Sequence, residues 1–116
     1  MTGTRVVEAS AIPHPGDFIT VRVDATPYLV THDANGQVHV LVNTCTHQAA
    51  TVCRATSGNA DSFECPNHFW VYRNDGTFVG SRLALATGRE APADPSKNLA
   101  SVPFTVADGW IVAHTD

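Results

Sequence analysis

The stretches Cys45-Thr46-His47 and Cys65-Pro66-Asn67-His68 decide how this chain is interpreted. Each pairs one cysteine with one histidine within a few residues, and residues 48–64 lie between the two pairs. Thiolate and imidazole are the protein ligands that zinc and iron–sulfur centres use. Four such ligands on two short segments predict a metal centre.

Two kinds of centre are compatible with two cysteines and two histidines. Tetrahedral zinc accepts this set, but zinc ribbons usually place two cysteines in one knuckle, whereas each knuckle here is mixed. A 2Fe-2S cluster in which two histidines replace two cysteines on one iron matches the mixed pairs. We therefore favour the cluster, and a zinc-stabilised Cys2His2 interaction module without redox activity is the alternative.

Outside these pairs, short apolar alternations are interrupted by turn signals, without a sustained 3.6-residue period. This pattern predicts an all-β fold. Strands are expected at 18–23, 28–32, 37–42, 61–65, 70–72, 77–79, 104–106 and 110–112, with turns at 33–36, 74–76 and 107–109. Residues 80–98 are expected to hold a short helix or a partner-facing loop. Both ligand pairs then lie on loops between strands.

The sequence around the ligand pairs resembles a known family. The matching stretches are NTCTH (43–47), TVC (51–53), GNA (58–60), FECPNHFWVY (63–72) and DGTF (75–78). They resemble the N-terminal Rieske domain of ring-hydroxylating oxygenase large (alpha) subunits and, more distantly, Rieske ferredoxins. The resemblance extends over about residues 16–112. It implies a Rieske-type fold of antiparallel sheets with two cluster-binding loops at one end.

The resemblance also implies the cofactor and its ligands. One Rieske-type 2Fe-2S cluster would be bound by Cys45 and Cys65 on one iron and by His47 and His68 on the other. The third cysteine, Cys53, is expected to be a small buried side chain and not a ligand. Side chains expected near the cluster, as donors or shielding groups, are Asn43, Thr46, Gln48, Trp70 and Tyr72.

Four positions depart from the family pattern, which usually reads C-x-H-R-G and C-P-Y-H-G-W. Gln48 and Ala49 replace the arginine and glycine of the first loop, and Asn67 and Phe69 replace the tyrosine and glycine of the second. Glycine in such loops commonly supplies a positive φ. We expect the ligands to be kept while the loops differ in backbone conformation, redox potential and docking surface.

The resemblance implies an electron-transfer protein or domain that delivers single electrons to an oxygenase catalytic iron or a similar acceptor. A reductase or ferredoxin would be the donor, and an oxygenase catalytic domain or subunit the acceptor. The 116 residues predict a single domain, 1–116, and no Asp-x-x-His-x-x-x-x-His stretch supplies a mononuclear iron site. Catalysis by this chain alone is therefore not expected.

Composition excludes other partners. A net charge of -4 with seven lysines and arginines argues against nucleic acid, whose phosphates require a basic surface. No secretory signal and no apolar run of about 18 residues is apparent, so we expect a cytoplasmic location without membrane insertion.

Overall fold

The computed structural model describes residues 3–23, 25–44, 51–65, 70–88 and 95–114. The strands in these ranges are β1 (Gly3–Glu8), β2 (Asp17–Val23), β3 (Thr26–His32), β4 (Val38–Val42), β5 (Ser57–Asn59), β6 (Ser62–Glu64), β7 (Trp70–Arg73), β8 (Phe78–Ser81), β9 (Phe104–Ala107) and β10 (Trp110–His114). Three short helices accompany them: η1 (Ala9–Ala11), α1 (Arg82–Ala86) and η2 (Pro95–Lys97). The all-β prediction is confirmed. Among the described residues, no helix is long and apolar enough to cross a membrane.

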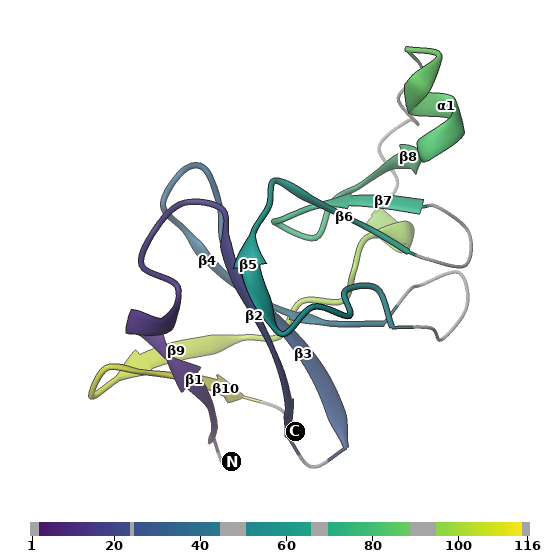
Figure 1. Ribbon diagram of the computed structural model, residues 1–116. Helices are drawn as coiled ribbons and strands as arrows, with labels where there is room; N and C mark the ends of the chain where they lie inside the picture. The colour runs from purple at the N-terminus through teal and green to yellow at the C-terminus, as the bar shows by residue number, and fades with distance from the viewer. Residues whose placement is uncertain (1–2, 24, 45–50, 66–69, 89–94, 115–116) are drawn as a thin grey trace.

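The strands form three antiparallel sheets (Figure 1). The central sheet has the order β4-β3-β2-β5, the terminal sheet joins β1, β10 and β9, and the third sheet is the meander β6-β7-β8. The terminal sheet and the meander lie on opposite sides of the central sheet in Figure 1. Because β1 pairs with β10, the two ends of the described chain lie side by side.

Alternation along the central strands divides the interior into two cores. Successive side chains of a strand point to opposite faces, so Leu29 packs on one side of the sheet while Tyr28 and Val30 pack on the other. The loop-side core contains Phe18, Leu29, Leu41, Val52, Cys53, Phe63, Cys65, Tyr72, Phe78 and Leu99. The terminal core contains Val6, Val7, Ile12, Tyr28, Val30, Val40, Ile111 and Ala113. The loop-side core is the one that positions the candidate site.

Two turns fix the hairpins on either side. Asp108 and Gly109 have φ angles of 53° and 80°, which is the left-handed pair that a tight two-residue hairpin between β9 and β10 requires. Gly76, at the turn before β8, has φ 92°, and a β-carbon there would lie 2.9 Å from Leu41 Cδ2. Glycine at 76 therefore lets the β7–β8 hairpin pack closely on the central sheet.

The expected strands are all present, with boundaries shifted by one or two residues, and the short helix expected within 80–98 is α1. Two strands were missed. In β1 a bulge between Arg5 and Val7 lets the consecutive residues Val6 and Val7 both face the interior. In β5 all three residues, Ser57–Asn59, are exposed and polar, and the strand exists because its backbone pairs with β2.

Candidate metal centre

The four expected ligands follow the ends of strands, but only one is described. Cys65 comes directly after β6, while Cys45, His47 and His68 lie in segments 45–50 and 66–69, outside the described residues. Thr46 and Gln48 also lie outside them. Within the described part of the chain, no three His, Cys, Asp or Glu side chains gather as a metal site. The structure therefore bears on this centre through the stems of its two loops.

The stem of the second loop is a closed pair of strands. Cys65 donates its backbone N–H to the carbonyl oxygen of Trp70 at 2.8 Å, immediately before and after residues 66–69. Below this bond, Glu64 pairs with Val71 and Phe63 with Tyr72. The Cys65 side chain is a thiol and is fully buried. The described stem therefore joins Cys65 and Trp70, on either side of residues 66–69, in one strand pair.

The stem of the first loop is held by one amide side chain. Thr44 and Thr51 form an antiparallel bridge on either side of residues 45–50. Next to it, buried Asn43 donates from Nδ2 to the carbonyl oxygen of Cys53 and accepts the Cys53 N–H at Oδ1, each at 2.8 Å. The Asn43 backbone N–H is bonded to the carbonyl oxygen of Pro27 in β3. The expected position of Asn43 near the cluster stays a prediction; in the structure its side-chain amide clamps the loop stem.

The two stems meet in one apolar environment. Val52 and Cys53, which follow the first loop, belong to the same loop-side core as Cys65 and Tyr72. Trp70 packs against that core from the end of the second loop. The buried Cys65 thiol thus shares one apolar core with the stem of the first loop, whose sequence carries Cys45 and His47. This arrangement fits the mixed thiolate–imidazole ligand set of a 2Fe-2S cluster.

Trp70 and Tyr72 lie on one face of β7, as their spacing predicts. The Tyr72 ring is fully buried and meets Phe78 edge to face, with ring centroids 5.9 Å apart. The half-buried Trp70 ring is tilted on Phe78 at 4.6 Å. Tyr72 therefore belongs to the same core as Cys65, and Trp70 packs against that core.

Cys53 has the environment of a structural thiol. It is buried, and its Sγ lies 3.8 Å from the carbonyl oxygen of Ala55. Burial raises the pKa of the Cys53 thiol, which keeps it protonated and a poor nucleophile.

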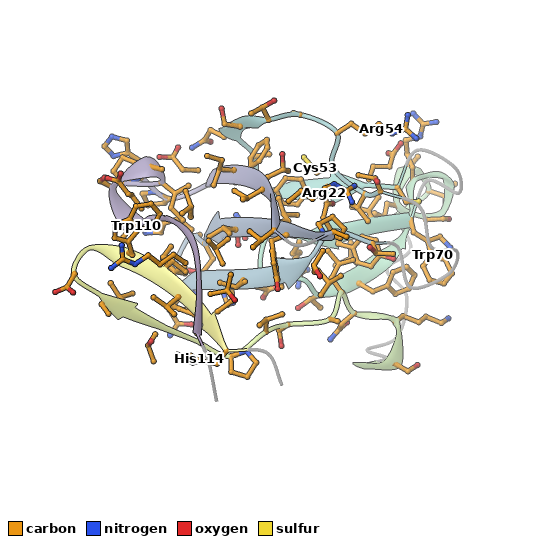
Figure 2. All side chains as sticks on the ribbon, turned by 90° about the horizontal axis from the view of Figure 1, so that it is seen from below. Arg22, Cys53, Arg54, Trp70, Trp110 and His114 are labelled. Carbon is orange, nitrogen blue, oxygen red and sulfur yellow. The ribbon has the colours of Figure 1, made fainter. Side chains whose placement is uncertain are left out.

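Two cationic features near the loops were not predicted from the sequence. A cavity of about 330 Å³ beside the first stem has Asn43, Thr51 and Cys53 in its wall and also includes Arg22 and Arg54. Figure 2 shows these two arginines in the same half of the molecule as Trp70, with Trp110 at the opposite end. Near the second stem, Lys97 places its Nζ 5.6 Å from the centre of the Trp70 ring. Neither feature has a local sequence signal, because each depends on segments that meet only in the fold.

Comparisons with known proteins agree with this arrangement. The family model for the Rieske [2Fe-2S] domain matches residues 3–87. The chain is 43% identical over 76 residues to the N,N-dimethyl phenylurea N-demethylase subunit alpha of Sphingobium sp. (strain YBL2), covering 66% of this chain and 17% of that protein. It is 36% identical over 103 residues to the glycine betaine monooxygenase oxygenase subunit of Pseudomonas aeruginosa (strain UCBPP-PA14), covering 86% of this chain and 23% of the relative.

The fold is similar to that of a solved oxygenase. Naphthalene 1,2-dioxygenase from Rhodococcus sp., solved with bound indole, superposes with a TM-score of 0.86 at 29% identity, over 99% of this chain and 26% of the other. The chain thus spans about a quarter or less of the length of these relatives. None of these similarities supports the zinc alternative. The chain belongs to the Rieske [2Fe-2S] domain family, and its cofactor is a Rieske-type 2Fe-2S cluster.

Proposed function

We propose that the chain is a one-electron carrier whose cluster is held by Cys45 and Cys65 on one iron and by His47 and His68 on the other. The observation that carries this assignment is the buried Cys65 thiol at the base of the second loop, in the same core as the stem of the first. When bound, a Rieske cluster takes up and releases single electrons at potentials of roughly -150 to +300 mV.

The protein's own residues would do three things for that exchange. The clamp between Asn43 and Cys53 would tie the stem of the first loop to the central sheet, where the Asn43 N–H bonds to Pro27 of β3. Tyr72 and Phe78, which share a core with Cys65, and Trp70, which packs against it, would shield that side of the cluster from water, and the Tyr72 hydroxyl would be a donor toward the cluster. By the family resemblance, His47 and His68 form the side through which electrons enter or leave.

The partners are inferred from the relatives, which include the oxygenase subunit of a glycine betaine monooxygenase. We propose that a reductase or ferredoxin reduces this domain and that the electron passes to a catalytic iron in an oxygenase domain or subunit. A cytoplasmic location, a single domain over 1–116 and the lack of catalysis by this chain alone remain predictions.

The ligand assignment is tested by loading and spectroscopy. Purified protein should contain two irons and two labile sulfides per chain, and its reduced form should give the low average g value of mixed His/Cys ligation. Substituting serine at Cys45 or Cys65, or leucine at His47 or His68, should abolish the spectrum. Cys53→Ser and His39→Gln are the matched controls outside the loops and should keep it. A protein that binds stoichiometric zinc and no iron, or a control variant that loses the cluster while folded, would overturn the assignment.

Electron delivery needs a separate assay. The visible absorbance of the loaded protein should bleach when NADH is added with a reductase–ferredoxin pair, and should recover on adding an oxidant. A loaded protein that such a pair cannot reduce, although dithionite can, would contradict the proposed donor class.

A further inference from the structure

The ammonium group of Lys97 lies over two aromatic rings at once. Its Nζ is 5.6 Å from the centre of the Trp70 ring and 5.5 Å from that of Phe78. The two ring centroids are 4.6 Å apart. Both distances from Nζ to a ring centre are within the range in which a cation is attracted by the face of an aromatic ring. The half-buried Lys97 side chain thus directs its ammonium group toward the rings of Trp70 and Phe78.

The residues that follow Lys97 hold this part of the chain in place. Asn98 Oδ1 accepts the backbone N–H of Phe78 at 3.0 Å. Leu99 donates its N–H to the carbonyl oxygen of Gly76 at 2.9 Å and buries its side chain in the loop-side core with Cys65. The segment 97–99 is therefore fixed against the β7–β8 hairpin, and Lys97 is fixed with it.

The residue beneath the ammonium group closes the second ligand loop. Trp70 follows residues 66–69 directly, and its carbonyl oxygen accepts the Cys65 N–H. Lys97 therefore presents a positive charge at the base of the loop that carries Cys65 and His68. It lies beyond residues 3–87, the part of the chain that the family model matches.

We propose that Lys97 sets the reduction potential of the cluster. Uptake of one electron adds one negative charge to the centre, and a cation fixed nearby favours that reduced state. The half-buried position and the aromatic surroundings weaken the screening that an exposed lysine would experience. The proposal rests on the ligand assignment made above, and no proton or second reactant is needed for the step.

The protein contains a matched control for this effect. Arg5 also places its cationic group over a tryptophan, with Cζ 5.4 Å from the centre of the Trp110 ring. That pair joins β1 and β10 at the opposite end of the molecule from Trp70 (Figure 2). Loss of Lys97 removes one charge and its contacts with the Trp70 and Phe78 rings, and loss of Arg5 removes one charge and its contact with the Trp110 ring. Of these two cations, Lys97 is the one beside a ligand loop.

The test compares midpoint potentials of cluster-loaded variants by redox titration. Lys97→Gln should lower the ratio of reduced to oxidised protein at a fixed ambient potential by about fivefold, which is about 40 mV at about 59 mV per tenfold change. Lys97→Glu should give a larger shift in the same direction, and Lys97→Arg should stay near the wild-type value. Arg5→Gln should leave the potential unchanged. The shift for Lys97→Gln should be smaller at high salt.

Stability separates the electrostatic role from a purely structural one. Both Lys97→Gln and Arg5→Gln should lower the thermal midpoint, Lys97→Gln by at least as much, since Lys97 lies over two aromatic rings and Arg5 over Trp110. Only Lys97→Gln should also lower the midpoint potential. If Lys97→Gln and Lys97→Glu, both with full iron and sulfide content, keep the wild-type potential, or if Arg5→Gln shifts it equally, the proposal is wrong. A wild-type chain without a cluster would instead contradict the ligand assignment. If Lys97→Gln does not bind the cluster, the midpoint potentials of Lys97→Arg and Lys97→Glu decide the question, and the proposal requires the glutamate variant to have the lower potential.

Discussion

Asn43 and Cys53 are joined by two hydrogen bonds of 2.8 Å, one in each direction between a buried side-chain amide and a peptide backbone. This pair links the end of β4 to the chain that returns from the first ligand loop. A backbone bridge between Thr44 and Thr51 lies next to it. The stem of the first loop therefore combines a side-chain clamp with a backbone bridge, whereas the described stem of the second loop is a pair of strands.

We expect Asn43→Ala to lower the free energy of unfolding by about 2–4 kcal/mol, because it leaves the buried N–H and carbonyl of Cys53 without their partner. Chemical denaturation of the loaded protein measures the change. Asn59→Ala is the control, since this exposed amide also makes two hydrogen bonds, to Pro15 and Asp17, and its loss should cost under about 1 kcal/mol. Equal losses in both variants would contradict the role of Asn43 as a clamp.

Cys53 and Cys65 are both buried thiols, but we expect opposite results from replacing them. Cys53→Ser should keep iron content and the visible spectrum, with a stability loss of about 1–2 kcal/mol from burying a hydroxyl in place of a thiol. Cys65→Ser should lose the cluster. Iron and labile sulfide assays on folded, monodisperse protein provide the comparison, and loss of the cluster in Cys53→Ser would show that this thiol is a ligand.

Removal of the metal should destabilise the fold. Segments 45–50 and 66–69 leave from stems in one core, so their ligands should pull that core together when the metal is bound, and metal binding then adds directly to folding free energy. Protein stripped by chelator under reducing conditions should melt at a lower temperature than the loaded form. Loaded protein carried through the same buffers without chelator is the control. Identical thermal midpoints would mean that the core closes without the ligands.

The carboxylate of Asp33 should titrate below its ordinary value. Burial by itself would raise the pKa of Asp33, but hydrogen bonds from His39 and from the N–H groups of Gln37 and Asn35 outweigh it, so the pKa lies below its ordinary value. A lowered pKa contributes stability that is present above the unfolded-state value and lost as the pH falls through the folded-state value.

The amide NMR shifts of Asn35 and Gln37 report this titration directly, because both N–H groups bond to Asp33 Oδ1. They should move with a midpoint below the ordinary pKa of an aspartate, and Asp33→Asn should abolish the movement. The stability advantage of the wild type over Asp33→Asn should be constant at neutral pH and shrink as the pH falls below about 4. A midpoint at or above the ordinary pKa of an aspartate would contradict the net effect of these bonds.

How far the sequence predicts this molecule depends on whether a feature is local. The central strands were predictable because their apolar residues alternate, as Leu29 and Leu41 do against Val30 and Val40. Strand β1 was not predictable, because its partner β10 is at the other end of the sequence and because its bulge breaks the alternation of buried residues.

The site follows the same division. The ligand pairs are readable because cysteine and histidine recur at short spacings. The structural role of Asn43 cannot be read from the sequence, because an asparagine before a loop equally indicates a turn. The placement of Lys97 is also hidden, since it depends on the packing of Leu99 and on the bond between Asn98 and Phe78.

The last prediction concerns Gln48, which follows the proposed ligand His47 by one residue and replaces an arginine of the resembling family. An arginine restored there should favour the reduced cluster for the same reason as Lys97. For an arginine charge and the added electron taken as about 8 Å apart in an effective dielectric near 20, the Coulomb energy is roughly 2 kcal/mol before solvent screening. Since about 59 mV corresponds to a tenfold change in equilibrium, we expect Gln48→Arg to raise the midpoint potential by some tens of millivolts, more at low salt than at high salt.

The combination of both sites distinguishes the origin of the effect. If two independent charges act on one centre, the shifts from Gln48→Arg and Lys97→Gln should oppose each other and add in the double variant. Gln48→Glu should lower the potential, while Gln48→Asn should leave it unchanged. A loaded Gln48→Arg variant whose potential stays constant or falls would refute the electrostatic account of this position, and would assign the arginine of the related oxygenases to partner docking instead.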